Sequence, residues 1–327
     1  MNRYTPFLVV ALLAVSVLVL RNKSGGGAPA GTLLPVVVGE LPDRVETLVN
    51  PQLFALDTLL YSPLDVQVED GFVYVSDAPV RLLRFDSSGR FVNQIGTGPG
   101  RGPGELLGYT DFLVQGDYVW IASLQSRSLS KYKLDGTHIS STGTEPGAYR
   151  LAKPGDSLVV HRPDPTLPLL RIGDDGGQGA GFGGSIAEQG FLMDVSGYLA
   201  STYSGKFIYA ATYASVLYEF DTSGNIERVI PTLDGVPFPT RTQGDVQRAR
   251  SSDQEVFVRD VAVDDGIIYV NTLYRREPRE SVIDLYDYSS GKYMRSLRLP
   301  YAIRKMDVDK GRVYAVRDTS VVTFDSW

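Results

Sequence analysis

Short segments in which hydrophobic and polar residues alternate recur from about residue 60 to the end of the chain. The two clearest are Asp65–Asp77 (DVQVEDGFVYVSD) and Asp260–Thr272 (DVAVDDGIIYVNT), each with two apolar runs around an acidic residue and a glycine. A period of two on both sides of a tight Gly turn predicts a β-hairpin. Weaker copies lie at Asp111–Ser123, Arg150–Arg162, Ala200–Thr212 and Lys305–Arg317.

A second pair of strands is predicted after each hairpin. The pattern is an apolar strand, a turn rich in Asp, Ser and Gly, and another strand, as in Leu82–Phe91, Tyr132–His138, Leu217–Ile226 and Leu285–Tyr293. Asp and Ser side chains bond the turn backbone, and Gly supplies the positive φ. The repeating unit is therefore four strands, and six units fit at a spacing of roughly 40–60 residues, which is typical of a β-propeller.

The last unit ends after its third strand, because Val321–Phe324 is followed closely by the C-terminal Trp327. An N-terminal segment is expected to supply the fourth strand, either Leu33–Val38 or Leu53–Leu60, and so remove the exposed edge. The predicted fold class is all-β: a six-bladed β-propeller of four-stranded antiparallel blades, closed by an N-terminal strand.

The N-terminus has a different character. Phe7–Leu20 is an apolar run of 14 residues interrupted only by Ser16. Its length suits the h-region of a signal peptide and falls short of a comfortable membrane span. We expect residues 1–30 to be a signal peptide or an N-terminal membrane anchor with a Gly-rich linker, and residues 31–327 to be the propeller. The protein is then extracytoplasmic, periplasmic or at the cell surface, and contacts a membrane only through this segment.

Composition narrows the chemistry. The chain has no Cys and only two His, which excludes disulfides, Cys-ligated zinc and thiol nucleophiles and disfavours a multi-His metal site. Residues 1–30 hold three basic and no acidic residues, so the remainder has 29 basic and 38 acidic residues and a net charge of −9. An acidic body disfavours nucleic-acid binding. We expect no cofactor and no resident metal.

Several segments together resemble NHL-repeat and related six-bladed β-propeller proteins. The hairpins centred on Tyr74 and Tyr269, the F-D-x-S-G turns and the interblade loop Ile95–Leu107 (IGTGPGRGPGELL) carry this resemblance. It implies an exported bacterial protein, although this chain lacks the lipobox Cys of the lipid-anchored members. Enzymatic members with several metal-binding His, or with a Glu, Asn and Asp metal site, are not matched residue by residue.

Two rings of residues are predicted to frame the channel at one face of the propeller. The first residues of the inner strands form one ring, made of Asp65, Asp111, Arg150, Ala200, Asp260 and Lys305. The last residues of the second strands form the other, made of Asp77, Ser123, Arg162, Thr212, Thr272 and Arg317. Blades 3 and 6 are basic in both rings. This pattern indicates either a polar funnel for an anionic ligand or salt bridges between neighbouring blades.

Loop lengths favour the same face. The turns within hairpins are expected to be uniformly short, whereas Gly96–Thr110, Pro231–Glu255 and Asn271–Ser281 are long and fall on the face of the two rings. A basic patch is predicted from Arg275, Arg276 and Arg279 together with Arg241, Arg248 and Arg250. Gly96–Gly104 superficially suggests a phosphate loop, but it lacks the GK[ST] ending, so we interpret its glycines as a tight interblade crossing.

These observations predict a binding or interaction module. The candidate ligand-binding residues are Asp65, Asp77, Asp111, Arg150, Arg162, Asp260, Lys305 and Arg317, and the ligand is a protein, a peptide, or an anionic small molecule or glycan. The alternative is a metal-assisted hydrolase or lyase that uses the channel carboxylates Asp65, Asp77, Asp111 and Asp260.

Overall fold

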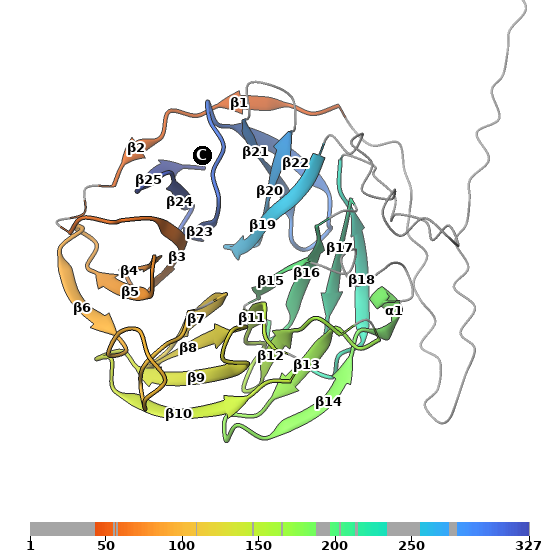
Figure 1. The fold of residues 1–327 in the computed structure, drawn as a ribbon. Helices are drawn as coiled ribbons and strands as arrows, with labels where there is room; N and C mark the ends of the chain where they lie inside the picture. Colours follow the sequence, from red (N-terminus) through yellow and green to blue (C-terminus); the bar gives the residue numbers. More distant parts are fainter. Residues whose placement is uncertain are drawn as a thin grey trace, which may run out of the picture.

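The structure is a computed structural model, and it shows six β-sheets arranged as blades around a central axis (Figure 1). It describes residues 43–326 apart from residues 55, 57, 109, 146, 165, 188–196, 203, 213–214, 234–255 and 275–279. The expected N-terminal segment, the strand Leu33–Val38 and the six arginines of the predicted basic patch lie outside the described residues. No helix among the described residues is long and apolar enough to cross a membrane.

The first three blades follow the predicted four-strand pattern. Blade 1 contains β3 (Pro63–Glu69), β4 (Phe72–Asp77), β5 (Arg81–Phe85) and β6 (Phe91–Ile95). Blade 2 contains β7 (Asp111–Gln115), β8 (Tyr118–Ser123), β9 (Ser128–Lys133) and β10 (His138–Gly143). Blade 3 contains β11 (Arg150–Ala152), β12 (Leu158–His161), β13 (Leu169–Ile172) and β14 (Gln178–Phe182), and the short helix α1 (Gly184–Ala187) follows it.

The last three blades repeat the pattern with two additions. Blade 4 contains β15 (Gly197–Ser201), β16 (Phe207–Ala211), β17 (Val216–Phe220) and β18 (Ile226–Pro231). Blade 5 contains β19 (Val256–Asp264), β20 (Ile267–Tyr274), β21 (Ser281–Asp287) and β22 (Tyr293–Arg298), with β1 (Glu46–Leu48) as a fifth strand. Blade 6 contains β23 (Met306–Asp309), β24 (Arg312–Arg317) and β25 (Ser320–Asp325), and β2 (Gln52–Leu53) completes it.

The ring closes with an N-terminal strand, as the missing last strand predicted. β2 pairs antiparallel with β25 through Gln52 opposite Thr323 and Leu53 opposite Val322, and the Phe54 amide donates to the Val321 carbonyl at 3.0 Å. The parallel pairing of β1 with β22 was not expected from the sequence. The N-terminal chain therefore runs along the rim of two consecutive blades before it enters blade 1 (Figure 1).

Turn chemistry follows the sequence pattern closely. Asp70 and Gly71 both have positive φ, 51° and 75°, as a two-residue hairpin turn of the I′ kind requires. In the outer turns an Asp carboxylate accepts the backbone N–H two residues on, as at Asp86 (2.9 Å) and Asp135 (2.8 Å). Gly136 has φ 91°, and a Cβ there would lie 2.6 Å from a carbonyl oxygen of blade 1, so only glycine fits.

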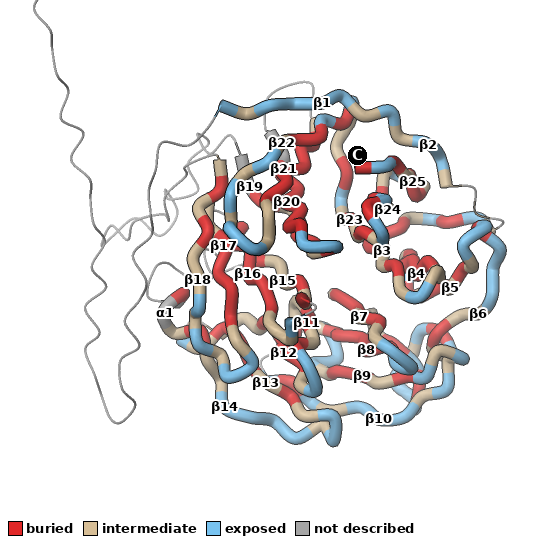
Figure 2. The backbone as a smooth tube through the Cα atoms, turned by 180° about the vertical axis from the view of Figure 1, so that it is seen from behind, coloured by how far each residue is buried: buried red, intermediate tan, exposed pale blue. Residues whose placement is uncertain are grey.

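The hydrophobic core is divided among the contacts between neighbouring blades. One cluster of buried side chains lies at each of the six interfaces; between blades 1 and 2, for example, Tyr74, Phe112, Ile121 and Tyr132 pack together. Figure 2 shows the same distribution, with buried residues on the inner and middle strands and exposed residues on outer strands such as β10 and β14. Each blade is thus held on both faces by apolar contacts.

Two expectations about the elements need correction. The turns within hairpins are not uniformly short, because residues 153–157 of blade 3 and 202–206 of blade 4 form longer connections. The expected loop Asn271–Ser281 is shorter than predicted, since β20 continues through Tyr274. Blade 3 has the fourth strand that the repeat predicts, β14, whose small residues pair with β13.

The N-terminal chain is tied to blade 5 by a buried charge, which generates a stability prediction. Arg44 Nη2 lies 2.8 Å from Asp284 Oδ2, and the Asp284 side chain has no exposed surface. Arg44→Ala would leave this carboxylate with one fewer partner, so we expect a loss of about 2–4 kcal/mol in the free energy of unfolding. Urea unfolding measures it. Arg90→Ala is the control, because Arg90 pairs with Asp86 in solvent and should cost less than about 1 kcal/mol; equal losses would contradict the prediction.

Candidate functional site

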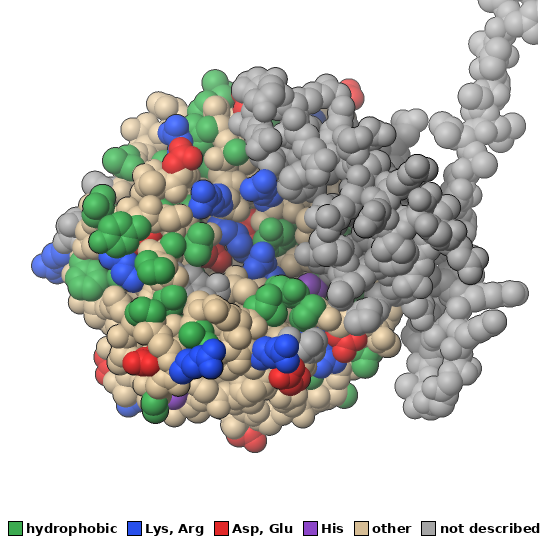
Figure 3. Space-filling view, viewed as in Figure 1, with side chains coloured by type: hydrophobic (Ala, Val, Ile, Leu, Met, Phe, Trp, Pro, Cys, Tyr) green, Lys and Arg blue, Asp and Glu red, His purple; other side chains and the backbone are tan. Residues whose placement is uncertain are grey.

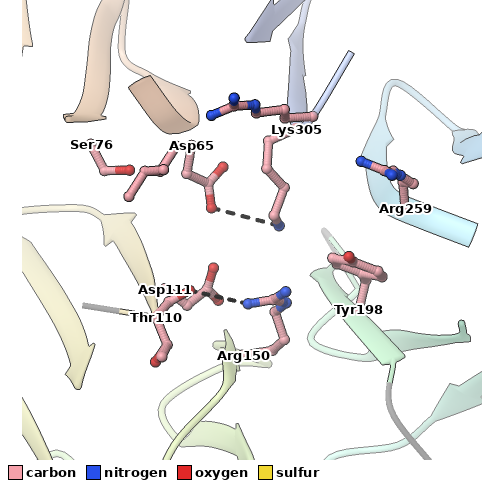
Figure 4. A pocket seen from close by; sticks show the side chains of 10 residues that line it. Asp65, Ser76, Thr110, Asp111, Arg150, Tyr198, Arg259 and Lys305 are labelled. Atoms are coloured by element: carbon pink, nitrogen blue, oxygen red, sulfur yellow. Dashed lines mark hydrogen bonds and ion pairs between the residues drawn. The ribbon is translucent and has the colours of Figure 1, made fainter. Parts of the chain in front are cut away.

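The channel along the propeller axis contains two cavities that meet at a layer of charged side chains. The cavity at one mouth has a volume of about 270 Å³, and the cavity below it has about 580 Å³. Asp65, Asp111 and Lys305 line both. These residues come from the innermost strands of blades 1, 2 and 6, so the layer is built by the ends of strands that the fold places around the axis (Figure 4).

Five of the six residues in the first predicted ring are brought together at this layer. Asp65, Asp111, Arg150 and Lys305 line the upper cavity, and Asp260 joins Asp65, Asp111 and Lys305 around the lower one. Ala200 does not take the expected place, because blade 4 has a longer hairpin turn that shifts its inner strand. Gly197 pairs with Ala211 as Asp65 pairs with Ser76, and the neighbouring Tyr198 lines the mouth.

The second predicted ring does not line either cavity, because its members are engaged elsewhere. The Asp77 carboxylate is fully buried. It accepts hydrogen bonds from the backbone N–H groups of Tyr61 (3.0 Å) and Ser62 (2.6 Å), and it forms an ion pair with Arg81. Arg162 Nη2 lies 3.1 Å from Asp164, and its Nε donates to the Leu167 carbonyl.

The remaining members of that ring are held locally too. Arg317 stacks on Tyr301 with its guanidinium carbon 3.7 Å from the ring centre. Ser123 accepts the Ser126 N–H, Thr272 donates to the Val282 carbonyl, and Thr212 is buried. The side chains of this ring therefore contact adjoining strands and connections, and they line neither channel cavity.

Lys305 is the centre of the charged layer. Its Nζ lies 3.0 Å from Asp260 Oδ1 and 3.6 Å from Asp65 Oδ2, so it bridges blades 5 and 1 from blade 6. Burial lowers the pKa of Lys305, but Asp260 and Asp65 outweigh this effect and raise the pKa above its ordinary value. Lys305 therefore stays charged. The predicted salt bridges between neighbouring blades are present in the structure.

Burial disfavours the charged form of the carboxylates in this layer and raises their pKa values. Burial raises the pKa of Asp65 to about 6, against the lowering effect of Lys305 and with a further raising effect of Asp111. Burial also raises the pKa of Asp111 and of Asp260. In addition, Asp111 accepts the Leu151 N–H and Asp260 accepts the Met306 N–H, both at 2.8 Å. Each of these two carboxylates is thus bonded to the backbone of the next blade.

Arg150 is held differently. Its Nη1 donates to the carbonyl oxygens of Thr110 (3.1 Å) and Tyr149 (2.8 Å), and its guanidinium carbon lies 4.7 Å from the Tyr198 ring centre. Lys305 Nζ lies 4.8 Å from the same ring. Two cations from opposite blades therefore lie against the same aromatic ring, and each is attracted to it. Figure 4 shows Arg150, Tyr198 and Lys305 pointing toward one another across the cavity.

The mouth is basic and the cavity below it is acidic. Arg150, Arg259, Arg304 and Lys305 line the mouth against two carboxylates, Asp65 and Asp111. Figure 3 shows Lys and Arg side chains gathered at the centre of this face. The lower cavity is lined by the acidic residues Asp65, Glu69, Asp70, Asp111, Asp260, Asp307 and Asp309 and by the basic residues Lys153, Lys305 and Lys310. The channel therefore has opposite charge at its two ends.

Sequence reasoning missed Arg259, Arg304 and Tyr198. Arg259 and Arg304 each immediately precede a predicted ring residue, in the pairs Arg259-Asp260 and Arg304-Lys305. This recurrence in blades 5 and 6 was a usable signal. Tyr198 carried no such signal, because its position depends on the length of the blade 4 turn.

Two buried polar atoms at the mouth have no hydrogen-bond partner. Ser76 lines the cavity and is 1% exposed, yet its hydroxyl makes no hydrogen bond; the Nε of Arg150 is also buried without a partner. Such groups are uncommon in folded proteins and are costly to bury. Both atoms belong to residues that line the same cavity. Together with the four cations of its lining, they make this mouth the candidate binding site.

The predicted metal-assisted alternative gains no support from the donor geometry. Asp77 lies outside the channel cavities, and Lys305 or backbone N–H groups occupy Asp65, Asp111 and Asp260. Within the described part of the chain, no group of three or more His, Asp or Glu residues is placed to hold a metal ion.

The loop at Gly96–Gly104 is closed by backbone hydrogen bonds. The Thr97 N–H donates to the Gly104 carbonyl, and the Gly100 N–H donates to the Leu106 carbonyl, which fits a crossing between blades.

Asp307 makes the stability of the ring pH-dependent. Its carboxylate accepts the Val68 N–H of blade 1 at 2.7 Å, and burial raises its pKa to about 8. A raised folded-state pKa means that the native chain loses stability as pH rises from about 4 to about 8. Asp307→Asn keeps a carbonyl oxygen for Val68 and removes the charge.

We therefore expect Asp307→Asn to match the native chain near pH 4 and to exceed it by more than about 1 kcal/mol above pH 8. Chemical denaturation at several pH values measures the difference. Asp309→Asn, at a more exposed position of the same strand, is the control. A constant gap between Asp307→Asn and the native chain across this range would overturn the assignment.

Comparisons with known proteins agree with the blades seen here. Residues 56–148 match a family described as a 6-bladed beta-propeller. Among solved structures, a member of the DUF4221 family from Bacteroides vulgatus has a TM-score of 0.63 at 11% identity, covering 86% of this chain and 98% of its own. A presumed exported protein from Bacteroides fragilis has a TM-score of 0.57 at 13% identity, with the same coverage.

A third solved structure, virginiamycin B lyase from Staphylococcus aureus, has a TM-score of 0.53 at 9% identity, covering 84% of this chain and 98% of its own. No curated protein matches the sequence. Identities this low show the fold alone. Together with the six blades of the structure, five of four strands and one of five, these matches confirm that the chain is a six-bladed β-propeller, as its resemblance to that group implied.

Proposed function

We propose that this protein is an extracytoplasmic binding module whose basic channel mouth holds a small anionic ligand, a carboxylate in the first instance. The observation that carries the proposal is the composition of the mouth, which is lined by four cations, Arg150, Arg259, Arg304 and Lys305, and two carboxylates, Asp65 and Asp111. Carboxylates are the natural partners of guanidinium groups, which bind them through two parallel hydrogen bonds.

The unmade hydrogen bonds support the same site. Salt bridges between blades explain why the charged side chains of Lys305, Asp260 and Asp65 lie in the channel. They do not account for the Nε of Arg150 or for the Ser76 hydroxyl, both buried at the mouth without a partner. A ligand at the mouth would lie beside the two residues that carry these atoms.

The volume limits the size of the group that enters. About 270 Å³ is slightly less than the smallest cavities that enclose a drug-sized ligand. The cavity therefore suits one anionic group and a few attached atoms, whether they belong to a free small molecule or to the end of a larger one. An acidic sugar residue or a terminal carboxylate meets this condition.

Two observations support the location outside the cytoplasm. The apolar run Phe7–Leu20 has the length of a signal-peptide h-region, and a structural neighbour is named as a presumed exported protein. Whether the segment is cleaved or anchors the protein is decided by N-terminal sequencing of the exported chain. Either outcome leaves the propeller on the same side of the membrane.

The test is to titrate acetate and sulfate into the purified propeller and to follow binding by calorimetry. The double variant Arg150→Gln with Arg304→Gln should weaken anion binding at least about 10-fold, since a hydrogen bond to a charged group contributes about 1.5–3 kcal/mol. Arg304→Gln alone, at an exposed position, should weaken binding to a smaller degree and guards against misfolding of the double variant.

The matched control is Arg162→Gln with Arg317→Gln. It removes the same charge from residues that line neither cavity. Affinity should change less than about 2-fold in this control, because charges outside the site act on it only through a screened field. If both double variants bind anions as the native chain does, or if the native chain binds no anion, the proposed function is wrong.

A further inference from the structure

An apolar shelf, formed by Leu59, Tyr61 and Leu64, lies beside the basic mouth. Leu59 is 77% exposed, Tyr61 is 62% exposed and Leu64 is 39% exposed. They lie on the segment that enters blade 1 and on the first residues of β3. Single exposed apolar residues are ordinary, but a cluster of large ones beside a polar cavity marks a surface that contacts another molecule.

The shelf is held in place by buried polar contacts. The Asp77 carboxylate accepts the N–H groups of Tyr61 and Ser62, and Arg81 donates to the Leu59 carbonyl at 3.2 Å. The Arg81 guanidinium carbon lies 4.3 Å from the Tyr61 ring centre. The exposure of these side chains is therefore fixed by the fold, since the backbone beneath them cannot move without breaking bonds to a fully buried carboxylate.

The shelf is continuous with the mouth. Leu64 lines the mouth cavity itself, next to Asp65 in the chain. From Leu59 to Asp65 the chain spans at most about 20 Å, so the whole shelf lies within that distance of the charged layer. Figure 3 shows hydrophobic side chains adjoining the central Lys and Arg group on this face. An elongated ligand can therefore contact both surfaces at once.

We propose that the ligand is an amphiphilic carboxylate of the fatty-acid class, with its carboxylate at Arg150 and Lys305 and its alkyl chain along the apolar shelf. This inference rests on the proposed function, since it assigns a class to the anion of that same site. The cations of the mouth favour a carboxylate at one end of the ligand, and the apolar side chains of the shelf favour an alkyl chain at the other.

The shelf backbone favours an alkyl chain over a peptide. The N–H groups of Tyr61 and Ser62 bond to Asp77, the Leu59 carbonyl bonds to Arg81, and the Ser62 carbonyl accepts the Ala78 N–H. A bound peptide would bury its own N–H and C=O groups against this surface and would need partners there. An alkyl chain has no such need.

Calorimetric titration of the full propeller with acetate, hexanoate and octanoate tests the inference. Each buried CH₂ group is worth up to about fourfold in affinity, so octanoate should bind at least about 10-fold more tightly than acetate even if the chain is half covered. Hexan-1-ol, which has the chain without the carboxylate, should bind more weakly than hexanoate. A peptide with a free C-terminus and apolar final residues is the competing ligand.

The variant Leu59→Ser with Tyr61→Ser should reduce the gain from acetate to octanoate to less than about 3-fold. It should leave acetate binding unchanged, because neither side chain lines the mouth cavity. Ile139→Ser is the matched control, because Ile139 is 43% exposed on the outer strand β10 and far along the chain from the mouth. The control should keep the full gain.

The outcomes separate the two proposals. If acetate binds through Arg150 but chain length or the shelf variant makes no difference, the amphiphile inference is overturned and the anion site stands. If the peptide binds more tightly than octanoate, the inference is overturned in favour of a peptide terminus. If no carboxylate binds at all, the proposed function itself fails.

Discussion

The ring depends on bonds from the inner strand of one blade to the backbone of the next. Within the described residues the six sheets are separate, so neighbouring blades share no β-ladder there. Instead a buried or half-buried side chain of one blade accepts a backbone N–H of its neighbour. Asp111 does this for Leu151, Asp260 for Met306 and Asp307 for Val68. The apolar clusters supply most of the attraction between blades, but they are non-directional. These directional bonds fix how far each blade slides and turns against the next.

The chemistry of the channel follows from this constraint. Asp111 and Asp260, which accept the backbone of the next blade, both line the channel. Negative charge is therefore placed around the channel by the assembly of the ring. Lys305 neutralises part of it, bridging Asp260 and Asp65. Arg150, Arg259 and Arg304 join Lys305 at the mouth, and this group of cations is the basis of the proposed ligand site.

Much of the fold could be predicted from the sequence because its local and global signals agree. Two-residue turns such as Asp70-Gly71, Asx-type outer turns such as Asp86, and alternating strands all point to the same unit, and the unit repeats. The first ring was found for the same reason, since Asp65, Asp111 and Asp260 occupy one position of the repeat. A fold can be predicted from its sequence when the turn residues, the strand pattern and the repeat all indicate the same unit, as they do here.

The errors arose where position depends on something other than the repeat. Ala200 was misplaced because a constant spacing was assumed, whereas the blade 4 turn at residues 202–206 is longer. Asp77 and Arg162 were assigned to the channel by position along a strand. Their side chains instead brace the adjoining connections. The strand β1 has three exposed residues and pairs in parallel with a distant strand, so no local pattern marks it.

The mouth combines two features that a stability argument alone does not explain. Burying the Ser76 hydroxyl and the Arg150 Nε without partners costs roughly 1–3 kcal/mol for each group. Keeping Leu59 and Tyr61 in solvent forgoes the burial of two large side chains, although Asp77 and Arg81 hold them firmly. Six apolar interfaces give the ring enough stability to carry both penalties. Penalties of this kind persist where binding uses them. Their meeting at one end of one channel is the strongest physical reason to place recognition there.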